Sequence, residues 1–279
     1  MQRLKTLLLA TAAVGAAGSA ARADEVGGSA SLSTSSASDT DGFTLPKGKL
    51  LLDAFVEMNL SKDLAFKPVS LAPDLWYGAT DDLTLGVVHS GESRTGFLGG
   101  IGDSVCLTGS DNGCAHVYNN VGLDGRIRIK KPFAVDVGLY INSISDPFQL
   151  AAKLGIDGRW VWGKLAVEAQ PSIFIGLTNR EPKDAMGNPV PSAANTETLY
   201  VPVTASYLVA PKFDLALQAG LVLPFTEPGD NWAIPLSLAA RYAISNQFGL
   251  GLAFTFPELI GGNSTADARS LTLGGSYAF

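Results

Sequence analysis

The sequence lacks several features that would identify a common class of protein. After the N-terminal region it has no run of about 18 apolar residues, so a membrane protein with this sequence has to be a barrel. Its only histidines, His89 and His116, have no partners at a spacing typical of a metal site or a histidine-dependent hydrolase. Basic residues number 20 against 26 acidic ones, which argues against a nucleic-acid partner.

The N-terminus has the pattern of an export signal. A basic head, Met1 to Lys5, precedes an apolar run from Leu7 to Ala17, and Ala21-Arg22-Ala23 forms a small-x-small cleavage pattern before Asp24. The apolar run is too short and too interrupted for a membrane-spanning helix. We therefore predict a cleaved signal peptide over residues 1–23. Its removal leaves 17 basic against 26 acidic residues, a formal charge of −9.

Cysteine is scarce. Cys106 and Cys114 lie together in one stretch rich in glycine, serine and aspartate. In the oxidising compartment that the signal implies, we predict a disulfide between them, worth about 2 to 3 kcal/mol if unstrained. Two free thiols would suit a cytosolic protein instead.

Residues 24–44 contain small and acidic residues and very little to bury. This composition predicts a disordered N-terminal tether. A short plug folded into a pore is the alternative, which the shortage of apolar residues disfavours.

From residue 45 to 279 apolar and polar residues alternate with a period of two, as in strands with one apolar face. Twelve stretches of roughly ten residues show it, the length of a tilted membrane strand. They are 50–60, 69–77, 83–87, 121–129, 135–141, 150–159, 165–177, 199–207, 215–223, 232–242, 248–256 and 270–279. We predict an all-β fold, an antiparallel, transmembrane, up-and-down β-barrel of about twelve strands. Ten or fourteen remain open because Pro73, Pro171, Pro202 and Pro235 interrupt the strands.

The connections between these stretches alternate in length. Short turns are expected near residues 80, 131, 162, 211 and 246, and long loops near 105, 188 and 263. Short periplasmic turns and longer outer loops are typical of outer-membrane barrels, so the cysteine loop is expected outside the cell. Aromatic residues gather near the strand ends, as two interfacial belts require; those beside the turns include Trp76, Tyr77 and Phe133.

The chain ends on a strand pattern. Leu271, Leu273, Tyr277 and the terminal Phe279 share one parity. This ending resembles the closing strand of bacterial outer-membrane β-barrels, and over residues 45–279 the chain is similar to that class in Gram-negative bacteria. The resemblance implies an outer-membrane location, contact with membrane lipid and recognition of the Phe279 strand by the barrel-insertion machinery. It implies no cofactor.

The parity opposite the apolar one is expected to line the lumen. The candidate lumen-lining residues are Asp53, Glu57, Asp124, Arg126, Arg128, Asp136, Lys153, Asp157, Arg159, Glu168, Gln170 and Arg241. Most lie on the stretches between 121 and 177, whereas later strands offer small residues. We expect this charged wall to reach across a lumen of intermediate width. Alternatively, ion pairs merely fill and rigidify the interior.

Three functions follow from this pattern. The leading one is a porin-like passive channel for small polar solutes or ions, with the inward charges setting selectivity. The second is a structural or surface-interaction barrel with a filled lumen, acting through the loop from Glu92 to His116. A lipid-modifying enzyme using His89 and Ser90 is the least favoured, since no catalytic or metal-binding set is recognisable. The sequence therefore predicts a non-enzyme.

Overall fold

The structure is a computed structural model that describes residues 43–61, 65–99, 104–114, 116–144, 147–182, 186–187, 194–262 and 266–279. The expected signal peptide and most of the expected tether lie outside these residues. The strands are β1 (Leu50–Asn59), β2 (Val69–Thr80), β3 (Leu83–Val88), β4 (Val105–Cys106), β5 (Val121–Lys130), β6 (Phe133–Ser143), β7 (Gln149–Trp162), β8 (Leu165–Ala169), β9 (Ser172–Gly176), β10 (Thr198–Ala210), β11 (Phe213–Pro224), β12 (Ala233–Ala243), β13 (Phe248–Gly261) and β14 (Ser270–Ala278). The helices are α1 (Gly91–Thr95), α2 (Pro228–Asn231) and the 3-10 turn η1 (Ser110–Asn112). Among the described residues, no helix is long and apolar enough to cross a membrane.

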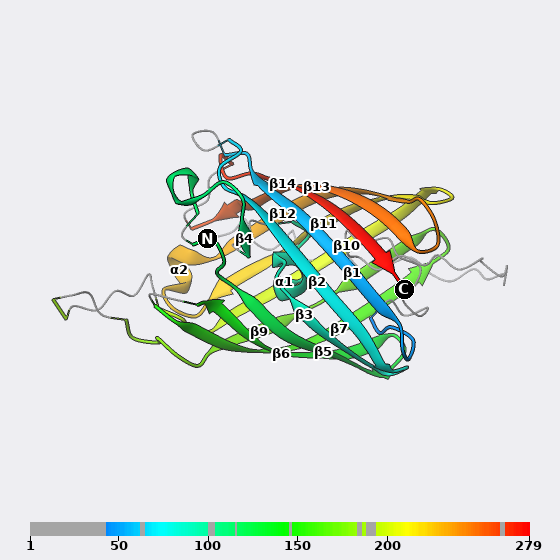
Figure 1. The fold of residues 1–279 in the computed structure, drawn as a ribbon, viewed down its shortest axis with the longest axis horizontal. Coiled ribbons are helices and arrows are strands. Elements are labelled where there is room, and N and C mark those ends of the chain that lie inside the picture. Colours follow the sequence, from blue (N-terminus) through cyan, green and yellow to red (C-terminus); the bar gives the residue numbers. More distant parts are fainter. Residues whose placement is uncertain are drawn as a thin grey trace, which may run out of the picture.

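The strands form one closed antiparallel barrel (Figure 1). Each wall strand pairs with the next along the chain, and β1 closes the circle by pairing with both β2 and β14. β8 and β9 follow one course between β7 and β10, and the short β4 pairs with the start of β2. The wall therefore has twelve strand positions, and the predicted all-β, up-and-down barrel of about twelve strands is confirmed.

The alternation along each strand separates a polar interior from an apolar exterior. In β1, Asp53, Phe55 and Glu57 are no more than 3% exposed, whereas Leu52 between them is 38% exposed. Leucine, isoleucine and valine dominate the outward positions of the other strands in the same way. An exterior of this kind is stable in lipid, where outward apolar groups need no water and the closed ladder leaves no edge.

The barrel wall accommodates the four prolines in its strands in different ways. Pro171 separates β8 from β9 without moving either strand away from its neighbours. Pro235 lies where the pairing of β12 with β13 shifts register between Ile234 and Leu236. Pro73 and Pro202 lie within β2 and β10, which continue through them. The count of twelve survives because each interruption is local.

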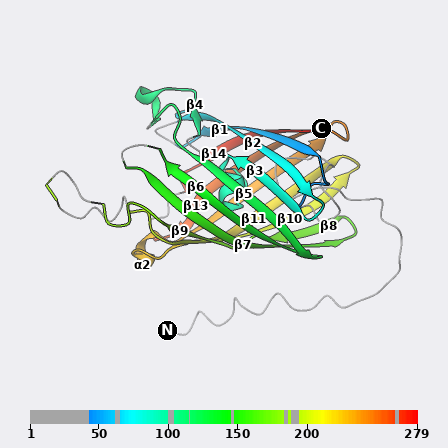
Figure 2. The ribbon, with the colours of Figure 1, turned by 60° about the horizontal axis from the view of Figure 1, so that its bottom comes forward.

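The two ends of the barrel differ (Figure 2). One end, here called the turn end, carries the tight connections after β2, β5, β7, β10 and β12, together with the C-terminus. The opposite loop end carries the long connections. Exposed aromatic residues lie near both ends, at the turn end Tyr77, Phe133, Trp162, Tyr242, Tyr277 and Phe279, and at the loop end Phe66, Tyr118, Phe148 and Phe225. The prediction that Trp76 belongs to the outer aromatic belt is wrong, because its side chain is 4% exposed and points inward.

A short segment before β1 closes part of the turn end. Phe43, Thr44 and Leu45 are all under 5% exposed, although the expected tether includes the first two. The Leu45 amide donates to Thr84 Oγ1 at 2.7 Å, and the Thr44 hydroxyl donates to the Asp81 carbonyl at 3.1 Å. The Leu45 side chain packs with Trp76 in a cluster inside the barrel.

Candidate functional site

The interior is crossed by a segment that leaves the wall after β3. Residues 90–99, here called the inward segment, include α1, which lies inside the barrel in Figure 1. The chain rejoins the wall where β4 pairs with β2. The prediction that the loop from Glu92 to His116 lies wholly outside is therefore wrong for its first part. The reason is that polar groups on opposite walls bind this part at both ends.

Local sequence explains why the inward segment turns so tightly. Ser90 caps α1 by accepting a hydrogen bond from the Ser93 amide at 3.0 Å. Gly96 ends the helix with a φ of 78°, and Gly99 has a φ of 74°. A Cβ on Gly99 would lie 2.8 Å from Thr255 Oγ1. Glycine at these positions allows the close approach to the far wall.

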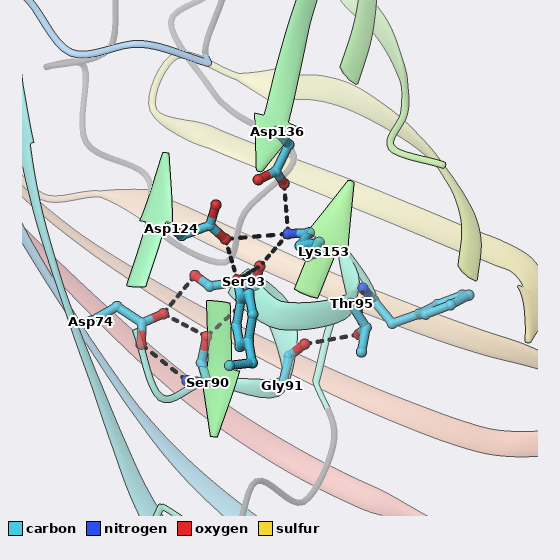
Figure 3. A network of polar contacts seen from close by, with 10 residues as sticks. Asp74, Ser90, Gly91, Ser93, Thr95, Asp124, Asp136 and Lys153 are labelled. Atoms are coloured by element: carbon cyan, nitrogen blue, oxygen red, sulfur yellow. Dashed lines mark hydrogen bonds and ion pairs between the residues drawn. The ribbon is translucent and has the colours of Figure 1, made fainter. Parts of the chain in front are cut away.

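The first anchor of the inward segment is Asp74 on β2. Its Oδ1 accepts hydrogen bonds from the backbone amides of His89 and Ser90 at 2.6 and 3.0 Å. Its Oδ2 accepts the hydroxyls of Ser90 and Ser93 at 2.5 and 2.6 Å (Figure 3). The Asp74 carboxylate is fully buried, so these four bonds replace its hydration.

The second anchor lies on the opposite wall. Gln218 Oε1 on β11 accepts the Leu98 amide at 2.6 Å, and its Nε2 donates to the Gly96 carbonyl at 2.8 Å. The Leu98 carbonyl accepts the hydroxyls of Ser237 and Thr255 at 3.0 and 2.7 Å. The inward segment is thus bound to strands on both sides of the lumen.

Apolar packing reinforces the second anchor. Leu98 is 1% exposed and lies in a cluster with Phe55, Ala72, Ala216, Ala239 and Ala253. The small side chains of the later strands therefore make room for Leu98. This corrects the expectation that the charged wall itself reaches across the lumen, because the inward segment occupies that space.

The charged wall faces the other side of the inward segment. Lys153 Nζ contacts Asp136 at 2.6 Å and Asp124 at 3.3 Å, and it donates to the Ser93 carbonyl at 2.9 Å (Figure 3). Tyr140 donates its hydroxyl to Asp124. Strands β5, β6 and β7 thus supply one ammonium group between two carboxylates, at the edge of α1.

The structure places all twelve candidate lumen residues on the inward face of the barrel. The buried ones are Asp53, Glu57, Asp124, Asp136, Lys153, Asp157, Arg159, Glu168 and Arg241, and the half-buried ones are Arg126, Arg128 and Gln170.

These residues do not form one cluster. Arg126 lies over the Trp76 ring at 4.3 Å, a cation–π contact. Arg128 is at the turn end, bound to Thr44 and 3.6 Å from Asp82. Arg241 pairs with Asp214 away from α1, its Nε lying 2.6 Å from Oδ2. The three arginines therefore contact three different parts of the barrel interior.

Two described cavities flank the inward segment. The larger holds about 550 Å³ and lies toward the loop end, between Arg94 of α1 and the ends of β6, β7, β9, β10 and β11. The smaller holds about 10 Å³, roughly the space of one water molecule. Its lining residues are Glu92, Ser93, Thr95, Gly96, Arg126, Asp136, Lys153, Gln170 and Ser172. The charged edge of α1 thus borders a cavity with room for about one water molecule, here called the constriction, and the larger cavity, here called the vestibule, lies toward the loop end.

The cysteines stand at the loop end. Cys106 and Cys114 form a disulfide with a Cα–Cα distance of 6.0 Å. It closes a hairpin, residues 104–119, in which the Cys106 amide donates to the Val117 carbonyl at 2.9 Å. This disulfide hairpin continues the barrel wall beside the start of β2, at the loop end.

The considered catalytic residues are engaged in structural contacts. The His89 ring hydrogen-bonds the Pro73 carbonyl and, at 3.0 Å, the Tyr118 hydroxyl, whose pKa partial burial raises above its usual value. Ser90 serves as the α1 cap and as a donor to Asp74. Among the described residues, no group of three or more His, Cys, Asp and Glu side chains could hold a metal ion.

Three residues of the site were not predicted from the sequence. Asp74 and Gln218 bind the inward segment, and Arg94 projects from it into the larger cavity. One signal was available, because Phe97 and Leu98 are adjacent apolar residues within the loop from Glu92 to His116 that is expected outside the cell. Two adjacent large apolar side chains are stabilised by burial and not by exposure to water, and the structure buries both.

A closed twelve-strand barrel with an apolar exterior and a polar, constricted interior defines the fold class of outer-membrane β-barrel proteins. The structure of the NanC porin is similar, with a TM-score of 0.54 at 10% identity, covering 81% of this chain and 98% of NanC. An outer membrane channel from Pseudomonas putida F1 gives 0.49 at 12% identity, covering 85% and 97% of the two chains. The KdgM porin gives 0.47 at 10% identity, covering 82% and 99%. No protein-family profile and no curated protein sequence matches the chain significantly.

Proposed function

We propose that the protein is a passive channel of the bacterial outer membrane for ions and small polar solutes. The observation that carries the proposal is the constriction between α1 and the charged wall, with a wider polar vestibule beside it. A polar interior bounded by fixed charges is the arrangement by which a pore selects solutes. The porin fold of NanC supports the same class of function.

In this proposal Lys153, Asp136 and Arg126 are the charges that a solute meets at the narrowest described point. Because the space there is about that of one water molecule, passage is restricted to small solutes or depends on movement of the inward segment.

The loop end faces the outside of the cell, and the signal peptide delivers the chain for export. Phe279, which is 55% exposed beside Tyr277, is the residue that the insertion machinery reads.

Liposome swelling tests solute passage. Liposomes containing the folded protein should swell in glycerol and resist swelling in sucrose, since the constriction passes small molecules first. Empty liposomes and liposomes with unfolded protein are the controls. Sucrose entering as fast as glycerol would contradict the narrow channel, and glycerol entry no faster than into empty liposomes would contradict the passage of small neutral solutes.

A second candidate is a closed barrel that binds an outside partner through the disulfide hairpin. Leu107 and Val117 in the hairpin are 57% and 70% exposed, which leaves apolar surface at the loop end. Replacing both with serine should then abolish binding of the folded protein to an apolar surface such as phenyl-agarose, while the barrel still folds. Unchanged binding by that variant would exclude the hairpin surface.

A further inference from the structure

The loop-end vestibule has the size and lining of a binding site for a small molecule. It holds about 550 Å³, within the range of cavities that bind organic ligands. The lining residues that matter here are Arg94, Asn142, Phe174, Tyr200 and Glu227. They come from α1, from the loop ends of β6, β9 and β10, and from the start of α2, so the inward segment completes the site.

Arg94 brings an uncompensated charge into the vestibule. Its side chain is half-buried, and among the described residues it makes no hydrogen bond or ion pair. It is the one basic side chain among the described lining residues, and the one acidic lining residue, Glu227, is exposed at the start of α2. A half-buried guanidinium without a partner is a site for a planar anion, which it can bind through two parallel hydrogen bonds.

Asn142 on β6 brings an unused acceptor to the same cavity. Its Oδ1 is buried and accepts no hydrogen bond from the residues that the structure describes. The neighbouring Asn195 differs, because its side-chain Nδ2 donates to the carbonyls of Leu150 and Thr178 at 2.8 and 2.9 Å. Among the described lining residues the vestibule therefore offers a free guanidinium and a free amide oxygen, which a ligand carrying both an anion and a hydroxyl group would satisfy.

An aromatic surface lies on the same side. The rings of Phe174 and Tyr200 are edge-to-face at 5.5 Å between centroids, and Tyr140 packs on Phe174 at 5.2 Å. Rings fixed in this way offer a rigid apolar surface to the carbon skeleton of a ligand. The vestibule thus combines a charge, a hydrogen-bond acceptor and an apolar surface.

We propose that the vestibule binds a small hydroxycarboxylate. Its carboxylate pairs with Arg94, a hydroxyl donates to Asn142 Oδ1, and its C–H groups lie against Phe174 and Tyr200. A single basic lining residue matches a monoanion, whereas a phosphate dianion would need a second cation. The inference rests on the proposed function, since it names the class of solute that enters the channel.

Calorimetric titration of the folded, detergent-solubilised protein tests the site without requiring transport. The probe is gluconate, and glucitol, which has an alcohol in place of the carboxylate, is the neutral control. Gluconate should bind and glucitol should bind at least about tenfold more weakly, the ratio expected for loss of a charge-assisted hydrogen bond. Equal binding of the two probes, or tighter binding of inorganic phosphate than of gluconate, would overturn the proposal.

Three variants assign the effect to named groups. Arg94→Gln should weaken gluconate binding about tenfold or more, whereas Arg269→Gln, which changes an exposed arginine outside the vestibule, should leave it unchanged. Asn142→Ala should weaken gluconate but not acetate, which has no hydroxyl group. Wild-type affinity for gluconate in Arg94→Gln would overturn the site.

The two proposals fail in different ways. Gluconate binding by protein that passes no glycerol would support the site and contradict the channel. A conducting, folded protein that gives no heat with millimolar gluconate would overturn the site and leave the channel standing.

Discussion

Replacing Asp74 with alanine should release the inward segment from β2 without unfolding the barrel. The substitution removes all four acceptor bonds and leaves the amides of His89 and Ser90 without their partner. A hydrogen bond to a charged group contributes about 1.5 to 3 kcal/mol, and relief of the buried carboxylate offsets part of the sum. We therefore expect a net loss of about 3 kcal/mol in the attachment of the segment, a shift of roughly 100-fold in the docked-to-released ratio.

Limited trypsin digestion measures this release, because Arg94 lies within the inward segment. Cleavage after Arg94 tracks the released population when opening is fast relative to cleavage, so its rate should rise by up to about 100-fold in Asp74→Ala. Asp214→Asn is the matched control, since it changes an interior carboxylate that contacts Arg241 instead. An Asp74→Ala protein that is cleaved after Arg94 no faster than wild type would refute the anchoring role of Asp74.

Three further changes test other parts of the account. Lys153→Met removes the positive charge from the constriction, so the reversal potential under a salt gradient should shift toward cation selectivity; no shift would show that ions do not pass beside Lys153. Leu98→Ala should cost about 2 to 5 kcal/mol at the second anchor and also accelerate cleavage after Arg94, whereas a wild-type rate would contradict the packing role of Leu98. Replacing Cys106 and Cys114 with serine should lower the stability of the disulfide hairpin by about 2 to 3 kcal/mol, seen as faster amide hydrogen exchange confined to residues 104–119; exchange that spreads through the barrel strands would contradict a local role.

The barrel was predictable because its signal is local. In β1 the alternation of Asp53, Phe55 and Glu57 with outward leucine and valine fixes which face turns inward, and the same parity holds through β8 and β9 across Pro171. Trp76 was misassigned because position near a strand end does not decide which parity an aromatic residue has.

The inward segment was not predictable from periodicity. Its anchors join residues that are distant in sequence, with Ser90 bound to Asp74 across 16 positions and Leu98 bound to Gln218 across 120. Nothing local distinguishes such a segment from an outer loop, because its polar groups are satisfied only once the barrel has closed around them. The inward-facing charged residues were predicted from the alternation. Their contacts were not, because the register of the strands decides that Lys153 lies beside α1, Arg128 beside Thr44 and Arg241 beside Asp214.

Conductance across a planar lipid bilayer tests the central claim most directly, that the inward segment narrows an open channel. Wild-type protein should be compared with a variant in which residues 91–98 are replaced by a glycine-serine linker of equal length, both shown to be folded. We expect small, discrete steps from wild type and clearly larger steps from the variant. Equal steps from the two proteins would contradict the constriction, and silence from wild type beside a conducting variant would contradict the channel in favour of a closed barrel.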